Sequence, residues 1–525
     1  MKRSLSVIWC VAFLLCSASA QTSFVKYYQG VGTAQFNLNE LSNGNILAGI
    51  ARQSGTTLLD PLGNILSTQC YAIDTLLGLV SVKRYSDNEF AFVGVYRKDT
   101  CSYSPTNPEY YPVIGRMDSL GNTHDVHYYS LNGVPCSNET SDLEILAGND
   151  VIAWGSYFQF FAMRVGPSGS VQWARRFTLG NRGSFKFIKE LPGGDLLAGI
   201  NMDTAGVVVA RLDAGGNFLW CKSYIRPRGI VSDCVVESDD SFVITGYTDS
   251  TMSTDPFTPL PPEYHPKLFM MELNGSGEVQ WCKGYDSAPY LWYARRGSRM
   301  VKSLDGNYVV LANLGVADYN IGYRPFLMKT DQNGDTLWTR SAGRLNYAYD
   351  ISDLLACADG GYMYSVRGFG LGPGIFKTDS LGYLPCQNRW HQVVVADLFP
   401  TDSSFTLSSV DGAVAYPAFV TDTIYDPLEV DDPCGTSTGM PLSRAGGFRV
   451  RPNPNTGRFT VEFQDPLMAE SYYSVYDAQG KLLYQRPLPA GATLEEVDLG
   501  RFGKGTYVLK FTDREGVCFE RVVVE

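Results

Sequence analysis

Few residues in this sequence have the type and spacing that metal binding requires. The chain has only four His, and His124 and His127 lie three positions apart. On a β-strand such positions point to opposite faces, so the pair would share a metal only in an irregular loop. The segment 331–335 resembles part of a calcium-binding loop but lacks the downstream acidic ligand. We therefore predict no metal and no cofactor.

Nucleophilic catalysis has no recognisable signature either. The sequence contains neither a Gly-x-Ser-x-Gly motif nor a phosphate-binding P-loop. A pair of catalytic carboxylates among the 54 acidic residues stays open, because such pairs meet in space rather than in sequence. Enzyme activity is therefore undecided, and we name no catalytic residue.

Aromatic residues supply the main candidates for ligand binding. They lie in three insertions, at 95–112, 248–266 and 286–297, and loops held by a rigid scaffold often carry binding. We predict that these insertions form a ligand face for a glycan or a protein. Its candidate residues are Tyr103, Tyr110, Tyr111, Tyr264, Tyr290, Trp292 and Tyr293.

The cysteines suggest disulfides rather than a metal site. Of 12 Cys, two lie in the first 20 residues, and no Cys-x-x-Cys pair is present. An even number in an exported chain favours disulfides. Cys386 and Cys434 could clamp the segment between them, and Cys221 and Cys234 could form a bridge within one repeat.

Composition and the first residues indicate an exported β-rich protein. The 525 residues are 44% hydrophobic and 18% charged, with 53 Gly and 32 Tyr, which favours strands and turns. A net charge of -11 argues against nucleic-acid binding. Residues 1–20 have the basic start, apolar run and Ala-Ser-Ala end of a signal peptide. No later apolar stretch is long enough to predict a transmembrane segment.

A repeat fills the region 21–390. An apolar pair, then Asp-x-x-Gly, then an apolar strand recurs seven times, starting at positions 60, 118, 166, 213, 274, 331 and 379. Gly166 and Asn274 replace the Asp in two copies. Asp caps a tight turn, and Gly adopts the backbone conformation that the turn needs. The predicted turn residues are Asp60, Gly63, Asp118, Gly121, Asp213, Gly216, Asp331, Gly334, Asp379 and Gly382.

Each repeat of 47 to 61 residues is long enough for four short strands, the size of a propeller blade. A similar strand, at 24–28, precedes the first complete repeat and could close a ring. We predict an all-β, seven-bladed β-propeller, with six or eight blades or an open β-solenoid as alternatives. The repeat resembles those of large secreted bacterial β-propeller proteins.

Two further regions follow. Residues 391–447 are a Ser/Thr/Val-rich extension and linker, and 448–525 are expected to form a small β-sandwich. The latter begins with Pro-Asn-Pro-x-x-Gly and continues with Tyr-Asp-x-x-Gly-Lys and Gly-x-Tyr motifs. The motif residues are Pro452, Asn453, Pro454, Gly457, Asp477, Gly480, Gly505 and Tyr507.

These ordered motifs resemble the C-terminal sorting domain, type A, of type IX secretion substrates from Bacteroidota. Cys518 is a departure from that pattern. The resemblance implies that the domain engages the type IX machinery and directs passage across the outer membrane. It also implies attachment to surface lipopolysaccharide or release into the medium.

Together these features predict an outer-membrane surface or extracellular protein. Its expected function is that of an adhesin or a glycan- or protein-binding propeller. The alternative is a secreted hydrolase that acts on polysaccharide or peptide. We expect no nucleic-acid partner.

Overall fold

The structure is a computed structural model. It describes residues 21–524 except for these segments: 30–34, 52–54, 73–76, 99–108, 132–139, 157–159, 179–182, 203–205, 225–228, 249–266, 288–289, 293–296, 317–322, 344–348, 369–371, 387, 389–392, 401, 405–407, 412, 418–420, 425–429, 434–436, 439–447, 464–470, 478–481, 490 and 513–516. The predicted signal peptide therefore lies outside the described residues.

The region of the repeat folds into antiparallel sheets of four consecutive strands. The first four sheets comprise β2 (Gln35–Glu40), β3 (Ile46–Ala51), β4 (Gly55–Leu59), β5 (Ile65–Ala72); β6 (Leu77–Ser86), β7 (Glu89–Lys98), β8 (Glu109–Met117), β9 (Thr123–Leu131); β10 (Thr140–Ile145), β11 (Val151–Ser156), β12 (Phe160–Val165), β13 (Val171–Thr178); and β14 (Gly183–Glu190), β15 (Leu196–Met202), β16 (Gly206–Leu212), β17 (Phe218–Tyr224).

Three more sheets complete the series. They comprise β18 (Ile230–Val236), β19 (Phe242–Thr248), β20 (Lys267–Leu273), β21 (Val279–Asp286); β22 (Tyr290–Trp292), β23 (Arg299–Lys302), β24 (Tyr308–Val316), β25 (Tyr323–Thr330), β26 (Thr336–Ser341); and β27 (Tyr349–Ala356), β28 (Tyr362–Gly368), β29 (Gly372–Thr378), β1 (Thr22–Tyr28). In the sixth sheet, both β22 and β23 pair with β24, so one inner strand is split in two.

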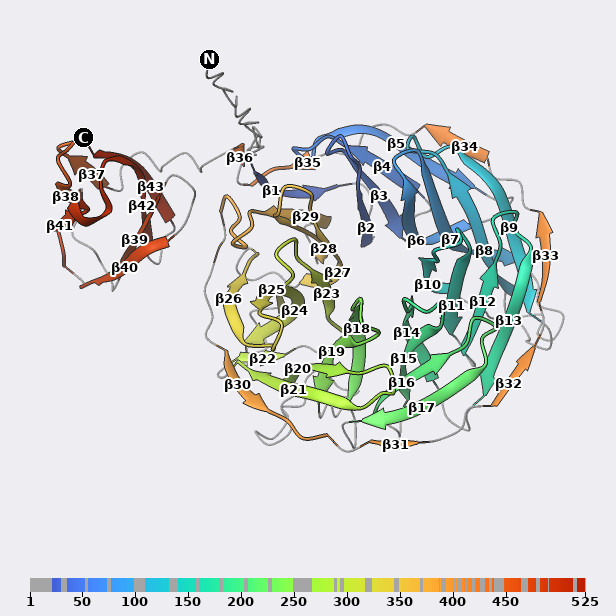
Figure 1. Ribbon diagram of the computed structural model, residues 1–525. Helices are drawn as coiled ribbons and strands as arrows, with labels where there is room; N and C mark the ends of the chain where they lie inside the picture. Colours follow the sequence, from blue (N-terminus) through green and yellow to red (C-terminus); the bar gives the residue numbers. More distant parts are fainter. Residues whose placement is uncertain are drawn as a thin grey trace, which may run out of the picture.

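The sheets form a ring, as Figure 1 shows. The innermost strand of each sheet contacts that of the next all the way round, from β2 through β6, β10, β14, β18, β23 and β27 back to β2. The N-terminal strand β1 pairs with β29, with Phe24 opposite Lys377, and so completes the last sheet. The predicted all-β propeller architecture and its closure by the N-terminal strand are confirmed.

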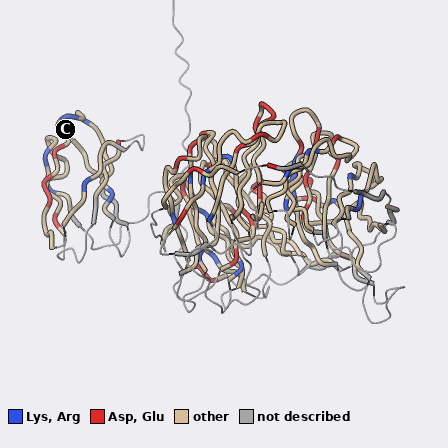
Figure 2. Tube along the Cα trace, turned by 90° about the horizontal axis from the view of Figure 1, so that it is seen from below, with Lys and Arg blue, Asp and Glu red and all other residues tan. Residues whose placement is uncertain are grey.

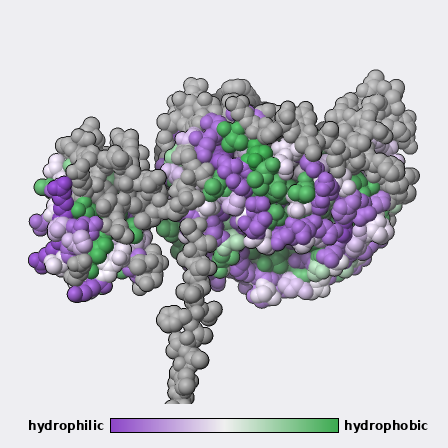
Figure 3. Space-filling view, turned by 90° about the horizontal axis from the view of Figure 1, so that it is seen from above, coloured by the Kyte–Doolittle hydropathy of each residue, from purple (hydrophilic) through white to green (hydrophobic). Residues whose placement is uncertain are grey.

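The surface of the ring is mixed in character. Edge-on, Figure 2 shows Asp and Glu residues interspersed with Lys and Arg. Figure 3 likewise shows hydrophilic residues beside smaller hydrophobic areas. The large apolar side chains exposed in the described residues are spread over most of the sheets and the C-terminal module, and they do not mark one docking face. They are Leu66, Leu120, Leu219, Leu304, Leu337, Leu381, Val394, Phe399 and Leu494.

The Asp-x-x-Gly turns connect each sheet to the preceding one. At the first turn, Asp60 Oδ1 accepts the backbone N–H of Leu62 and of Asn64, at 2.9 and 2.8 Å. Gly63 has a φ of 76°, a conformation that residues with a Cβ rarely adopt. Its carbonyl accepts a 2.9 Å hydrogen bond from the hydroxyl of Tyr28, on β1. Equivalent bonds join Tyr71 to Gly121, Tyr129 to Gly169, Tyr224 to Gly277 and Tyr285 to Gly334.

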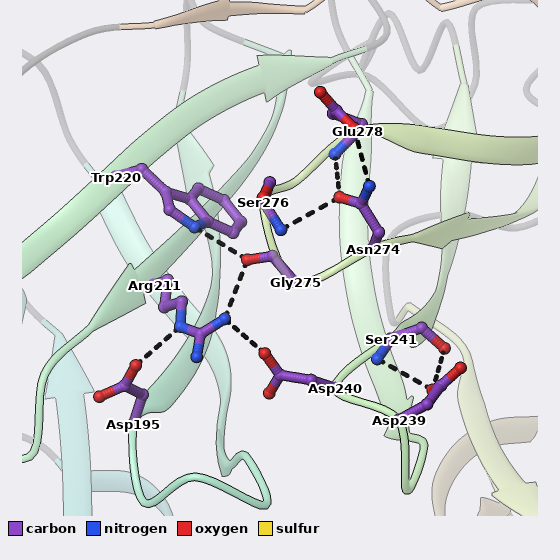
Figure 4. Close-up of polar contacts among 10 residues, drawn as sticks. All are labelled: Asp195, Arg211, Trp220, Asp239, Asp240, Ser241, Asn274, Gly275, Ser276 and Glu278. Carbon is purple, nitrogen blue, oxygen red and sulfur yellow. Dashed lines mark hydrogen bonds and ion pairs between the residues drawn. The ribbon is translucent and has the colours of Figure 1, made fainter.

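A second contact between neighbouring sheets involves cationic residues (Figure 4). Arg211 Nε donates to Asp195 Oδ2 in its own sheet, at 2.8 Å. Its Nη1 donates to Asp240 Oδ2 (2.6 Å) and to the Gly275 carbonyl (3.0 Å), both in the next sheet. Trp220 Nε1 donates to the same carbonyl, at 3.2 Å. The recurring turn thus joins adjacent sheets as well as adjacent strands.

Removal of one such tyrosine hydroxyl should destabilise the ring. Tyr285→Phe deprives the buried Gly334 carbonyl of its 2.7 Å hydrogen bond, so we expect the free energy of unfolding to fall by about 1–2 kcal/mol in urea denaturation. Tyr110 is half-buried and its hydroxyl makes no hydrogen bond within the described residues, so Tyr110→Phe serves as the control. Equal losses in the two variants would contradict a specific role for the turn contact.

Residues 394–438, here called the belt, wrap the outside of the ring (orange in Figure 1). Its strands add antiparallel outer edges to six sheets, in the reverse of their chain order. They are β30 (Val394–Asp397) on β21, β31 (Ser403–Ser404) on β17, β32 (Ser408–Asp411) on β13, β33 (Ala413–Pro417) on β9, β34 (Thr421–Ile424) on β5, and β35 (Val430–Asp431) and β36 (Ser437–Thr438) on β1. The expected extension and linker is therefore largely part of the ring.

The C-terminal module is a small β-sandwich, as predicted. One sheet holds β37 (Phe448–Arg451), β38 (Arg458–Phe463) and β41 (Leu494–Asp498), and the other holds β40 (Leu482–Leu488), β39 (Ser471–Tyr476), β42 (Gly505–Thr512) and β43 (Val517–Val524). A short 3-10 helix, η3 (Gly500–Phe502), precedes β42. The module has its own core, which includes Val461, Val475, Leu509 and Val522.

The predicted Cys221–Cys234 bridge is wrong, because both residues are buried free thiols. They belong to different hydrophobic cores. Cys221 lies in the core between its own sheet, β14 to β17, and the preceding sheet, whereas Cys234 lies in the core between β14 to β17 and the following sheet. Burial raises the pKa of Cys221 to about 12, so its thiol stays protonated. Cys386 is disulfide-bonded. Cys434 lies outside the described residues, so the Cys386–Cys434 pairing stays a prediction.

Candidate functional site

Charged side chains gather on the innermost strands, around the axis of the ring. We call this group the axial charged ring, and it brings together residues from six sheets. Its members are Lys83 on β6, Asp142 and Glu144 on β10, Lys186 and Lys189 on β14, Asp233 on β18, Arg299 on β23 and Asp353 on β27. Sequence reasoning did not identify them.

A weak sequence signal marks three of these residues. Asp142, Asp233 and Asp353 each follow a Ser and precede Leu or Cys. Each Asp follows a β-bulge, a shift in the pairing of its strand with the second strand of the sheet. A bulge changes the direction in which a side chain points. The repeated Ser-Asp pair could therefore have marked an equivalent position in three sheets.

Two of these carboxylates join neighbouring sheets. Asp233 Oδ2 accepts the backbone N–H of Met300 at 3.0 Å, and Asp353 Oδ2 accepts that of Leu38 at 2.8 Å. Arg299 Nε donates to the Ser352 carbonyl at 3.0 Å. Three side chains of the axial charged ring are therefore held in place by hydrogen bonds to the backbone of a neighbouring sheet.

Most of the cations in this ring face carboxylates. Lys189 Nζ lies 2.8 Å from Glu144 Oε2. Burial would lower the pKa of Lys189, but Glu144 and Asp233 outweigh it and raise the pKa. In the same way, burial would lower the pKa of Lys83, but Asp142 and Asp353 outweigh the effect of burial and the pKa is raised. These lysines are therefore held in their charged form.

The carboxylates of the axial charged ring differ in the direction of their pKa shifts. Burial raises the pKa of Asp142, but Lys83, Arg299 and hydrogen bonds from Ser81 and the backbone together outweigh this effect, and the pKa is lowered overall. Burial raises the pKa of Asp233 in spite of opposition from Arg299 and Lys189. A cavity of about 260 Å³ lies on another part of the ring, beside Lys83 and Glu144. It is lined by Lys83, Arg84, Tyr85, Glu144, Ile145 and Asn149.

The predicted aromatic ligand face is only partly described. Tyr110 and Tyr111 lie in β8, and Tyr290 and Trp292 lie in β22, so these four belong to strands rather than to loops. The Tyr111 ring packs against Tyr96 and Tyr128, with centroids 6.0 and 5.5 Å apart. The other predicted members, Tyr103, Tyr264 and Tyr293, lie outside the described residues.

The two metal candidates occupy ordinary turns and strands. Asp331 Oδ1 accepts backbone N–H groups from Asn333 (2.9 Å) and Asp335 (2.8 Å), and Asp335 pairs with Lys283. His124 Nδ1 lies 3.1 Å from Asp125 Oδ2. Within the part of the chain that the structure describes, no three His, Cys, Asp or Glu side chains form a metal-binding group.

The motif residues at the start of the C-terminal module hold its first strands and its last strand together. Asn453 Oδ1 accepts the backbone N–H of Val523 at 2.9 Å. Gly457 has a φ of 102°, and its carbonyl accepts the N–H of Leu499 at 2.6 Å. Tyr507 donates its hydroxyl to the Phe502 carbonyl, at 2.8 Å. Pro452 and Pro454 flank Asn453, Gly505 opens β42, Asp477 follows β39, and Gly480 lies outside the described residues.

Comparison with protein families decides what this module is. Residues 449–525 match the family described as the secretion system C-terminal sorting domain. These residues are a secretion sorting domain. The protein is therefore secreted or displayed at the cell surface, and the sorting domain supports delivery by the type IX system. Across the described residues, no helix is both long and apolar enough to cross a membrane.

Solved structures resemble the chain only distantly. Virginiamycin B lyase from Staphylococcus aureus has 10% identity and a TM-score of 0.43, covering 68% of this chain and 99% of its own. A protein of unknown function from Bacteroides caccae has 13% identity and a TM-score of 0.37, covering 58% and 97%. The Dos1 propeller has 10% identity and a TM-score of 0.36, covering 70% and 95%. A search of curated proteins finds no match.

Proposed function

We propose that this protein is an exported binding protein, an adhesin or a glycan- or protein-binding propeller, and that its ligand site lies at the axis. The axial charged ring carries this proposal. Its side chains come from six sheets that are joined by hydrogen bonds between strands, turns and neighbouring sheets. A rigid scaffold of this kind holds polar groups ready for a ligand at low entropic cost.

The sorting domain sets the location of this binding. The protein would engage the type IX machinery through residues 449–525. It would then be attached to surface lipopolysaccharide or released. Either outcome places the propeller outside the cell, where extracellular glycans and proteins are its available ligands.

A hydrolase is the second candidate, and one observation favours it. Asp142 has a lowered pKa and Asp233 a raised one, and environments that separate two carboxylates in this way suit a base and an acid. The backbone hydrogen bonds that Asp233 accepts from Met300 and Cys234 support a fixed structural role instead. We therefore place binding first.

A glycan and protein array with the purified mature chain, run beside hydrolysis assays on the same polymers, tests this proposal. We expect saturable binding to at least one glycan or protein without turnover. Turnover that disappears in both Asp142→Asn and Asp233→Asn would reject the binding protein in favour of the hydrolase. An array with no bound ligand would also count against the proposal.

A further inference from the structure

Lys186 differs from the other cations of the axial charged ring. It stands at a bulge in β14, where Phe185 pairs with Ile200 and Phe187 with Gly199. Phe185 and Phe187 are each 2% exposed, whereas Lys186 is exposed. The bulge therefore takes Lys186 out of the strand pairing and leaves its amine accessible to solvent among the inner strands.

The charged group that most affects the pKa of Lys186 is another cation, Arg299 on β23. The amine reaches solvent, but the inner strands around it displace part of its hydration and lower its pKa, and Arg299 lowers the pKa further. In the described residues Lys186 forms no ion pair with a carboxylate, in contrast to Lys189 with Glu144. Two cations of this kind favour the binding of an anionic group, which would relieve their repulsion.

The surroundings limit what that anionic group can belong to. Asp142, Asp233 and Asp353 are half-buried, and carboxylate oxygens accept hydrogen bonds from hydroxyl groups. A ligand with one carboxylate and several hydroxyls suits this arrangement, whereas an acidic peptide with several carboxylates would be repelled by the three Asp side chains.

We propose that Lys186 and Arg299 bind the carboxylate of an acidic sugar, a uronic-acid unit of an extracellular glycan, at the axis of the propeller. The neighbouring Asp carboxylates would accept hydrogen bonds from the sugar hydroxyls. This inference rests on the proposed binding function and gives it a ligand class.

Calorimetry on the mature full-length chain tests the site, with a trisaccharide of one glucuronic acid and two glucose units and a neutral glucose trisaccharide as probes. We expect the acidic probe to bind at least tenfold more tightly than the neutral one. Lys186→Gln should weaken binding of the acidic probe about tenfold, because it removes one charge-assisted hydrogen bond. Lys267→Gln, at a lysine that is 46% exposed on β20, is the matched control and should bind like the wild type.

Several outcomes would overturn this inference. Equal affinity of wild type and Lys186→Gln for the acidic probe would remove the role of Lys186. Tighter binding of a Glu-rich peptide than of the sugar would replace the ligand class. If the array shows a bound ligand whose affinity Lys186→Gln leaves unchanged, the ligand class is wrong but the binding function stands.

The amine of Lys186 also has a testable reactivity. Because partial loss of hydration among the inner strands and Arg299 lower its pKa, a larger share of the amine is neutral at pH 8 than for an ordinary lysine. An acylating reagent should therefore modify Lys186 faster than Lys267 in peptide mass spectrometry, and the acidic trisaccharide should slow the reaction. Equal rates at the two lysines, or no protection by the trisaccharide, would contradict the proposed site.

Discussion

Deletion of residues 448–525 is expected to abolish surface delivery and to leave the protein in the periplasm. The deleted part matches a secretion sorting domain over 449–525 and has its own hydrophobic core. The ring closes through β1 and the belt without it, so the truncated chain should still fold. Protease accessibility on whole cells, combined with cell fractionation, measures the result. Surface exposure of the truncated protein would reject the sorting role.

A single substitution in the sorting domain should also abolish surface delivery. Gly457 has a φ of 102°, and a Cβ there would lie 2.9 Å from the Cα of Gly500, so Gly457→Val should disrupt the sorting domain. Thr506 lies on β42 of the same module and is exposed. Thr506→Val, a change of nearly equal volume, is therefore the control, and it should reach the surface normally.

Loss of the predicted Cys386–Cys434 disulfide should lower the stability of the ring substantially. The belt strands β30 to β35 lie between these two residues, and β35 pairs with β1, next to β29. The chain from 386 to 434 spans 48 residues, and a loop of that length corresponds to ~4 kcal/mol in the loop-entropy model. For a ring of this size, that loss lowers the Tm by about 5 °C. Thermal unfolding of Cys386→Ser measures it.

The pairing has two internal controls. Cys434→Ser and the double variant should lose as much stability as Cys386→Ser alone, because all three remove one bond. Cys70→Ser changes a half-buried free thiol and should have a smaller effect. Additive losses in the double variant, or a free Cys434 thiol in mass spectrometry of the oxidised protein, would exclude the pairing.

Local signals made much of the propeller predictable from the sequence. The Asp-x-x-Gly turn is contained within a few residues, and the strand at 24–28 repeats a pattern found in later copies, so the closure of the ring could be predicted. The belt could not. Several of its strands, such as Ser403–Ser404 and Val430–Asp431, have only two residues. Two residues have no periodicity, and their pairing depends on edges that exist only after the ring has closed.

The axial charged ring was missed for a related reason. Lys83 and Asp353 are 270 positions apart (353 minus 83) in the sequence and come near one another only through ring closure. The Cys221–Cys234 prediction was wrong because proximity in sequence does not show which side of a sheet a side chain faces. The aromatic candidates were predicted to lie in loops because some strands are longer than the repeat pattern indicates. Tyr110, for example, lies in β8, which begins inside the predicted insertion.

The belt also determines how the ring would respond to a mechanical load. Tension applied through the sorting domain reaches β36 first and then β35, both on β1. The strands that follow, β34 to β30, are separate short attachments to successive sheets. Without the disulfide, the belt would peel off one sheet at a time, and each step would absorb work while the blades stay intact. With the disulfide in place, tension would pass from residue 434 straight to residue 386, and the strands β35 to β30 would carry none of it.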